Sequence, residues 1–131
     1  MKNHFSHFLL SLFLFLCLLF TACEKEQECS EKYIARVQSA EGPTTAALNQ
    51  LIALNVSFGT SNGCQRFNRF YTISAEKEVA IQLEVLEEGC AYTQEALLRS
   101  EAFTFGSQEA GEYLLKFQKG TSFVEHTITA D

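Results

Sequence analysis

Carboxylates are the most plentiful side chains in this sequence that are suited to acid–base chemistry. Glu84, Glu87 and Glu88 lie close together, and Glu109 and Glu112 lie on either side of a glycine. Hydrolysis of a glycosidic bond needs two such acids facing each other across a gap of about 5 to 9 Å. Strand and hairpin positions instead turn these side chains to water. We therefore interpret the five acids as solvated surface and predict no catalytic residue and no enzyme activity.

His126 is the one histidine outside the first 22 residues. On a regular strand it shares a face with Val124 and Ile128, and no candidate nucleophile is linked to it in sequence. We expect a half-buried ring with a backbone partner. Without further histidines or a Cys-x-x-Cys spacing, the sequence predicts no metal site and no cofactor. The formal net charge of −6 weighs against nucleic acid as a partner.

The segment from Cys64 to Tyr71 combines two arginines with three aromatic residues, next to a loop of Gly, Ser and Asn. Arginine and aromatic side chains are enriched where protein interfaces are strong. Arg66, Arg69 and Phe70 therefore form a candidate binding patch for a protein or glycan partner. The alternative is structural: Phe67 or Phe70 must face the core, and the two arginines would merely balance neighbouring glutamates.

The elements that must position these residues are strands, because apolar residues recur with a period of two from residue 33 onward. The alternation is irregular between residues 67 and 73, which indicates a bulge. Residues 44–51 and 93–99 contain good helix formers, and we expect loops there with at most a turn or two of helix. The seven candidate strands are 33–38, 52–58, 67–73, 79–85, 103–105, 113–118 and 122–129. Short strands at this spacing predict an all-β, antiparallel β-sandwich.

Residues 1–22 are typical of an export signal. Lys2 supplies a positive start, and residues 8–20 are apolar except for Ser11. A helix of that length reaches about 20 Å, short of a bilayer core of about 30 Å, which favours a cleaved signal. The sequence from Leu19 to Cys23 resembles the lipobox of bacterial lipoproteins. This resemblance implies cleavage before Cys23 and acylation of its thiol; the alternative is an ordinary signal peptide cut after Ala22.

Residues 23–31 are expected to be the lipidated cysteine and a flexible tether, since residues 24–28 contain no apolar side chain. Lipoproteins displayed on the surface of Bacteroidota-type bacteria are similar, with a short acidic stretch after the cysteine. This similarity implies an outer-membrane lipoprotein at the cell surface. A spacer facing the periplasm is the alternative. Residues 32–131 would then form the folded domain.

Three cysteines remain beyond Cys17 and Cys23. An exported protein can form disulfides, and three thiols allow one bridge with one cysteine left over. Cys64 and Cys90 each follow a glycine at the edge of a strand pattern, so we pair these two. A bridge from Cys29 to either of them is the alternative, and Cys29 otherwise stays free.

Residues 109–113 place an acid, a glycine and a tyrosine at the spacing acid-x-Gly-x-Tyr. This pattern resembles the tyrosine corner of immunoglobulin-like sandwiches. Gly111 would permit the sharp turn between sheets. Tyr113 would bury its ring and return its hydroxyl to the backbone upstream. An ordinary hairpin with a core tyrosine is the alternative.

The order of three short motifs is similar to that in small Bacteroidota-type lipoproteins with an immunoglobulin-like domain. They are Asn62-Gly63-Cys64, Gly89-Cys90 and the corner at residues 110–113, where Ala110 replaces a proline. The resemblance implies an immunoglobulin-like antiparallel β-sandwich of about seven strands. We expect a lipid-anchored module of the cell envelope with a non-catalytic binding or structural role. The alternative is an envelope-associated hydrolase or protease inhibitor.

Overall fold

The computed structural model describes residues 30–89 and 95–131, and these residues fold entirely as strands, turns and loops. The all-β prediction is confirmed, and each of the seven predicted strands is present. An eighth strand, of two residues, lies in the loop before the second predicted strand. The strands are β1 (Ser30–Glu41), β2 (Thr45–Ala46), β3 (Ile52–Thr60), β4 (Gln65–Ala75), β5 (Glu78–Glu88), β6 (Leu97–Phe105), β7 (Gly111–Lys119) and β8 (Ser122–Ala130).

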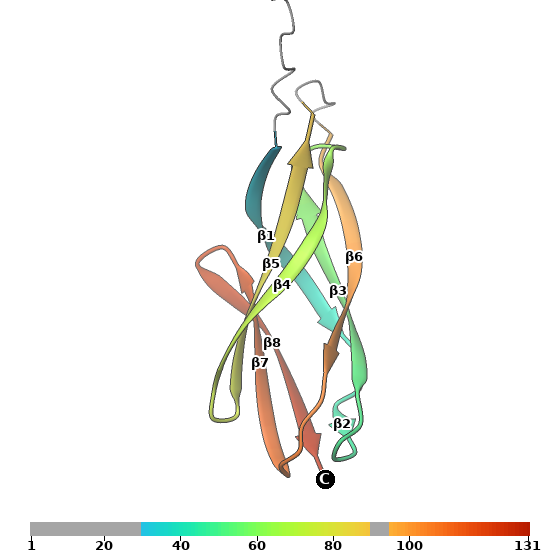
Figure 1. Cartoon of the computed structure of the whole chain (residues 1–131), viewed down its shortest axis with the longest axis vertical. Coiled ribbons are helices and arrows are strands. Elements are labelled where there is room, and N and C mark those ends of the chain that lie inside the picture. The colour runs from blue at the N-terminus through green and yellow to red at the C-terminus, as the bar shows by residue number, and fades with distance from the viewer. Residues whose placement is uncertain (1–29, 90–94) are drawn as a thin grey trace, which may run out of the picture.

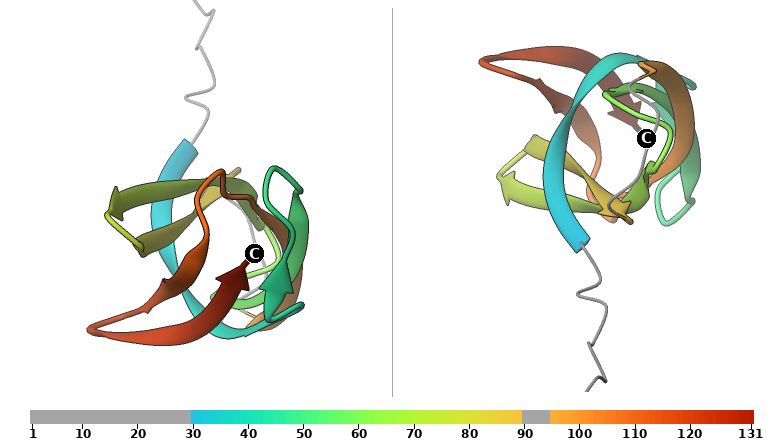
Figure 2. Two further views of the ribbon diagram at one scale, coloured as in Figure 1. Left: turned by 90° about the horizontal axis from the view of Figure 1, so that it is seen from below. Right: turned by 90° about the horizontal axis from the view of Figure 1, so that it is seen from above.

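The strands form one curled sheet in the order β2-β8-β7-β5-β1-β3-β6, with β4 on β5 outside this path. Strand β1 joins two groups of strands, because residues 30–35 pair with β5 and residues 36–41 pair with β3. The strands run along the long axis of the molecule, with the start of β1 and the carboxyl terminus at opposite ends (Figure 1). Viewed along that axis, the sheet curls around the core (Figure 2).

The sheet is mixed, which corrects the prediction of a wholly antiparallel arrangement. Strands β5 and β7 pair in parallel over four residues, and β2 pairs in parallel with β8. The reason is the path of the chain after β5, because β6 pairs with β3 and not with β5. The chain then returns and enters β7 in the same direction as β5. Alternating residues reveal a strand, but they carry no information about which strand lies beside it.

The loops at residues 44–51 and 93–99 contain no helical turn in the described part of the chain. Strand β6 begins at Leu97, so the predicted strand at 103–105 is longer than expected. Its first residues pair with the end of β3, where Leu97 lies opposite Thr60. Backbone pairing with a neighbouring strand therefore outweighs the helix propensity of this short segment.

The core lies inside the curl and is built from every second residue of β3, β5 and β7, with further buried side chains from β1, β6 and β8. Full burial of a large apolar side chain contributes about 1.5 to 3 kcal/mol, so these positions supply most of the stabilisation. The largest fully buried side chains are Phe58, Phe117, Leu54, Ile81, Leu83, Leu115, Ile128, Val37, Val56 and Val85.

Candidate functional site

A bulge in β4 decides where the predicted patch residues point. The register with β5 shifts between Phe67 and Arg69, so Asn68 is an extra residue, and the predicted bulge is confirmed. In a regular strand, residues three positions apart lie on opposite faces. The bulge instead places Phe67 and Phe70 together against the core. Arg69 lies opposite Glu84 on the outer face of the sheet.

Phe70 is part of a chain of aromatic rings that crosses the core. Its ring centroid lies 4.9 Å from that of Phe67 and 5.1 Å from that of Phe103 on β6. Phe103 in turn makes an edge-to-face contact with Phe117 at 5.3 Å. The structure therefore separates Phe70 from the two arginines, because the bulge turns the phenylalanine inward. The predicted patch of Arg66, Arg69 and Phe70 does not form one surface.

Glu84 is the centre of a polar cluster on the outer face of β5. The residue is only 7% exposed, which differs from our prediction of a solvated carboxylate. Asn68 Nδ2 and Arg69 Nε donate to Glu84 Oε1 at 2.5 and 3.2 Å. Tyr71 Oη donates to Oε2 at 3.0 Å. The bulge explains the burial, because it brings two adjacent polar side chains of β4 over one residue of β5.

These contacts shift two pKa values in opposite directions. Burial raises the pKa of Glu84, but the hydrogen bonds from Asn68, Tyr71 and Arg69, together with the Arg69 charge, outweigh burial and leave this pKa below its ordinary value. Burial and the hydrogen bond to Glu84 raise the pKa of Tyr71. At neutral pH the cluster therefore contains an ionised carboxylate and a neutral phenol. A carboxylate held ionised in this way is a poor general acid.

Arg66 pairs with Glu88 at the surface, where both side chains are at least half exposed. The two arginines of β4 thus each balance a glutamate of β5, which is the structural alternative that the sequence left open. The carboxylates of Glu84 and Glu88 face these arginines, and Glu87 binds two amide side chains. The described residues hold no group of three or more His, Cys, Asp or Glu side chains placed to bind a metal ion.

The Glu87 carboxylate closes a buried network at the tip of β3 and β4. Its Oε2 accepts from Asn62 Nδ2 at 2.9 Å and from Gln65 Nε2 at 2.8 Å. Asn62 Oδ1 also accepts from the backbone amides of Cys64 and Gln65, at 2.9 and 3.1 Å. Gln65 Oε1 accepts from the amide of Ser61 at 2.8 Å. The network therefore fixes the loop that carries Cys64.

A first hollow, of about 550 Å³, opens beside this network. It exists because β1 changes its partner at Arg36: residues 30–35 pair with β5, and residues 36–41 pair with β3. The first half of β1 therefore diverges from the end of β3. We call it the wedge. Its lining includes Tyr33, Ile34, Arg36, Gln38, Thr60 and the three side chains of the Asn62–Gln65–Glu87 network.

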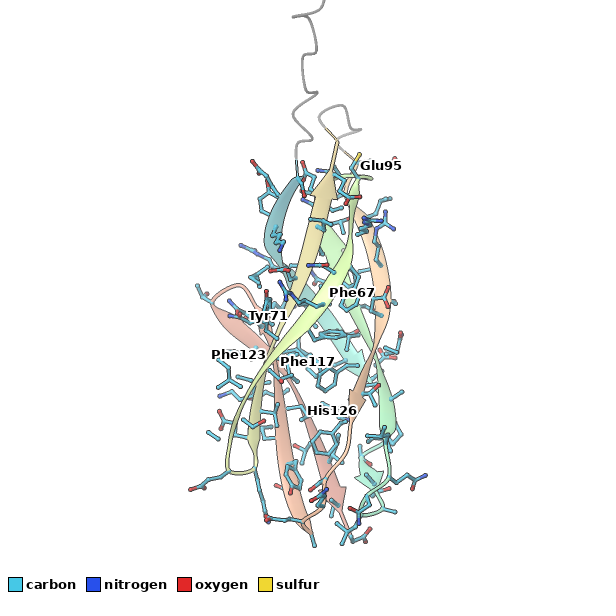
Figure 3. All side chains as sticks on the ribbon, viewed as in Figure 1. Phe67, Tyr71, Glu95, Phe117, Phe123 and His126 are labelled. Carbon is cyan, nitrogen blue, oxygen red and sulfur yellow. The ribbon has the colours of Figure 1, made fainter. Side chains whose placement is uncertain are left out.

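A second hollow, of about 150 Å³, lies on the outer face of the sheet between the β4–β5 and β7–β8 hairpins. We call it the hairpin hollow. Register places four side chains across it: Tyr71 lies opposite Gln82, and Gln118 lies opposite Phe123. Gln82 Nε2 donates to Gln118 Oε1 at 2.6 Å and joins the two pairs. Figure 3 shows Tyr71 and Phe123 on the same side of the molecule, half-way along its length.

Apolar carbon is exposed around the hairpin hollow. Ile73 is 71% exposed, Phe123 47% and Tyr71 38%. A cation lies over each ring: Arg69 Cζ is 4.6 Å from the Tyr71 centroid, and Lys116 Nζ is 4.9 Å from that of Phe123. Sequence reasoning missed this site. Tyr71 and Ile73 are two apart on a strand, which indicates a shared face, but nothing in the sequence indicates that Phe123 lies beside them.

Tyr113 is buried, and its hydroxyl donates to the carbonyl of Glu109 at 3.0 Å, while Ser107 Oγ donates to this hydroxyl at 2.6 Å. Gly111 has a φ of +140°, a conformation that side chains of other residues disfavour. His126 is half-buried, and its Nε2 lies 2.9 Å from the carbonyl of Pro43. These residues are positioned as structural elements of the domain.

Cys23, Cys29 and Cys90 lie outside the described residues, as does the whole predicted signal segment. The predicted lipidation at Cys23 and the predicted Cys64–Cys90 bridge therefore stay predictions. Cys64 is half-buried at the start of β4, next to the loop that Asn62 fixes.

Comparison of the chain with protein-family models, with curated proteins and with solved structures gives no significant match. Within residues 30–89 and 95–131, no helix is long and apolar enough to cross a bilayer.

Proposed function

We propose that this protein is a lipid-anchored module of the cell envelope that binds a partner without chemical turnover. The observation that carries this proposal is the hairpin hollow, where Tyr71, Ile73 and Phe123 expose apolar surface on a rigid sheet. Exposed apolar side chains that gather at one place are typical of binding surfaces. The cations over the two rings hold them in position before a ligand arrives, which reduces the entropy lost on binding.

The anchor is acylated Cys23 at the outer membrane, either at the cell surface or on the periplasmic face. Six residues lie between Cys23 and Ser30 at the start of β1, which gives a reach of at most about 25 Å. The wedge lies beside the first residues of β1 and so would face the bilayer. The hairpin hollow lies further along the body of the domain (Figure 3) and would remain accessible to a ligand.

The non-catalytic part of the proposal is supported by the state of the clustered acids. Glu84, Glu87 and Glu88 each bind neighbouring side chains and are not paired across an open cleft. For the fold we propose a variant of the immunoglobulin-like sandwich. Its support is the Tyr113 hydroxyl bonded to the backbone upstream, and β1 shared between two groups of strands.

Site-specific photocrosslinking in full-length protein on intact cells tests the binding site. A photoreactive residue at position 73 should give discrete adducts, because this position borders the hairpin hollow. Position 98 on β6 is the matched control, since Leu98 is 70% exposed and Ile73 is 71% exposed. Equal labelling from both positions would contradict the proposed site. Turnover of a glycan or peptide that a single Glu→Gln change abolishes would contradict the non-catalytic role.

Mass spectrometry of the amino terminus tests the anchor. The native protein should begin at Cys23 with acyl chains attached, and Cys23→Ser should release the domain from membranes, because two or three chains are needed for a stable anchor. An unmodified amino terminus at residue 23 would support the ordinary signal peptide instead.

A further inference from the structure

We infer that the hairpin hollow binds a single neutral sugar ring within a glycan chain. This inference rests on the proposed binding function and names its ligand class. The lining consists of Tyr71, Ile73, Ala80, Ile81, Gln82, Gln118 and Phe123, none of which carries a charge at neutral pH. This lack of charge contrasts with the chain as a whole, which contains 16 acidic and 10 basic residues. A lining without charge gives a charged ligand no partner and so selects against it.

The two aromatic rings are the rims of the site. They belong to β4 and β8, and two further strands, β5 and β7, lie between them. At a spacing of about 4.8 Å, the outer strands are about 14 Å apart, which leaves room for a flat ligand between the rings. The C–H faces of a sugar ring are apolar and suit aromatic side chains, as they suit the apolar walls of ligand pockets in general.

Each ring is in contact with the cation of an ion pair. Arg69 stacks on Tyr71 and pairs with Glu84, which also accepts a hydrogen bond from the Tyr71 hydroxyl. Lys116 stacks on Phe123 and pairs with Glu78 at 3.0 Å. The charges therefore neutralise one another outside the lining. What remains towards the ligand is ring surface in a fixed orientation.

The floor of the site is an amide pair with hydrogen-bonding capacity left over. Gln82 donates to Gln118 Oε1, and Gln118 Nε2 donates to the carbonyl of Gly120 at 3.2 Å. An amide has two N–H donors and an oxygen acceptor, so Gln82 Oε1 and one N–H of each residue are left without a partner among the described residues. Sugar hydroxyls both donate and accept, and so would satisfy these groups.

The amide floor also favours a sugar over an apolar side chain of a partner protein. Such a side chain would cover the spare amide groups without bonding to them, which is unfavourable.

The volume of the hollow indicates the size of the ligand. A hollow of about 150 Å³ corresponds to about five water molecules, enough for one small ring and too little for a drug-sized ligand. The hollow is only partly enclosed, so the rest of a glycan chain would extend into solvent.

Calorimetric titration of the full-length protein in detergent with neutral oligosaccharides tests the inference. The probes are the hexasaccharides of β-1,4-glucose, α-1,4-glucose, β-1,3-glucose, β-1,4-xylose and β-1,4-mannose, with oligogalacturonate as a charged control. We expect at least one neutral oligosaccharide to bind and the charged one not to bind. Phe123→Ala and Gln82→Ala should each weaken binding by about tenfold, since each removes one principal contact.

Leu98→Ala is the matched control, because Leu98 is equally exposed but lies on β6. It should leave affinity within about twofold. If Phe123→Ala fails to fold, Ile73→Ser replaces it, since a residue so exposed contributes little to folding. The inference is overturned if no neutral oligosaccharide binds at millimolar concentration, or if these variants bind as well as the wild type. Discrete protein adducts from position 73 would then keep the binding function and exclude the sugar, whereas equal labelling from positions 73 and 98 would exclude both.

Discussion

The two hollows of this domain differ in what they do with their polar groups. In the wedge, the side chains of Asn62, Gln65 and Glu87 bind one another and the backbone. In the hairpin hollow, Gln82 and Gln118 form one bond between them and keep further donors and an acceptor for other molecules. The wedge is larger, and yet the polar atoms of this network are already bound to one another and to the backbone.

This difference separates a structural hollow from a binding hollow better than volume does. A polar group gains from a ligand only if it lacks a partner in the free protein. Buried polar groups that satisfy one another instead hold the chain in one conformation. Substitutions in the wedge should therefore change stability, and substitutions in the hairpin hollow should change binding.

The largest change in stability should come from Asn62→Ala. It removes the acceptor of two backbone amides and a donor to Glu87 within a buried network. We expect the free energy of unfolding to fall by about 2 kcal/mol, measured by urea denaturation. Asn55→Ala is the control, because Asn55 is exposed on the neighbouring part of β3. Equal stability of the two variants would show that the network does not hold the loop.

A second test concerns the pH dependence of stability. The pKa of Glu84 is lower in the folded chain than its ordinary value of 4.5, so the unfolded state binds more protons near that pH. The stabilisation is present above about 4.5 and is lost as the pH falls through the folded pKa. In Glu84→Gln this acid-dependent loss should be smaller, as measured by urea midpoints between pH 7 and pH 3. Glu101→Gln, at an exposed position of β6, should keep the wild-type dependence.

Ile73→Ser should change binding without changing stability. The side chain is 71% exposed, so we expect the free energy of unfolding to stay within about 0.5 kcal/mol of the wild type. Leu98→Ser provides the matched comparison on β6. A much larger loss of stability in Ile73→Ser would place this residue in the core of the hairpin and would weaken the contrast between the hollows.

The smallest effect should come from Arg66→Ala. Its partner is Glu88, and both side chains are at least half exposed, so the ion pair is screened by water. We expect a change below about 0.5 kcal/mol in urea denaturation and no change in oligosaccharide affinity. A tenfold loss of affinity would restore Arg66 to the binding site, as the sequence first suggested.

The sequence predicted the strands well, because alternation between faces is a local property. It also predicted the bulge in β4, where Phe67 and Phe70 break the period of two. Of the patch that it proposed, Phe70 packs against the core, since the same bulge turns this ring away from the two arginines. The expectation of solvated acids failed for Glu84, because the burial comes from side chains of another strand.

By itself, the sequence determined the class of the fold and the inner and outer positions of the regularly alternating strands. Tertiary structure alone decided which strands are neighbours, and with them the site. The parallel pairing of β5 with β7 brings Gln82 next to Gln118, and so sets Tyr71 and Phe123 on the two rims of one hollow. The reason is physical: side-chain alternation depends on adjacent residues, whereas strand pairing is a contact between distant segments that many alternating sequences would satisfy equally well.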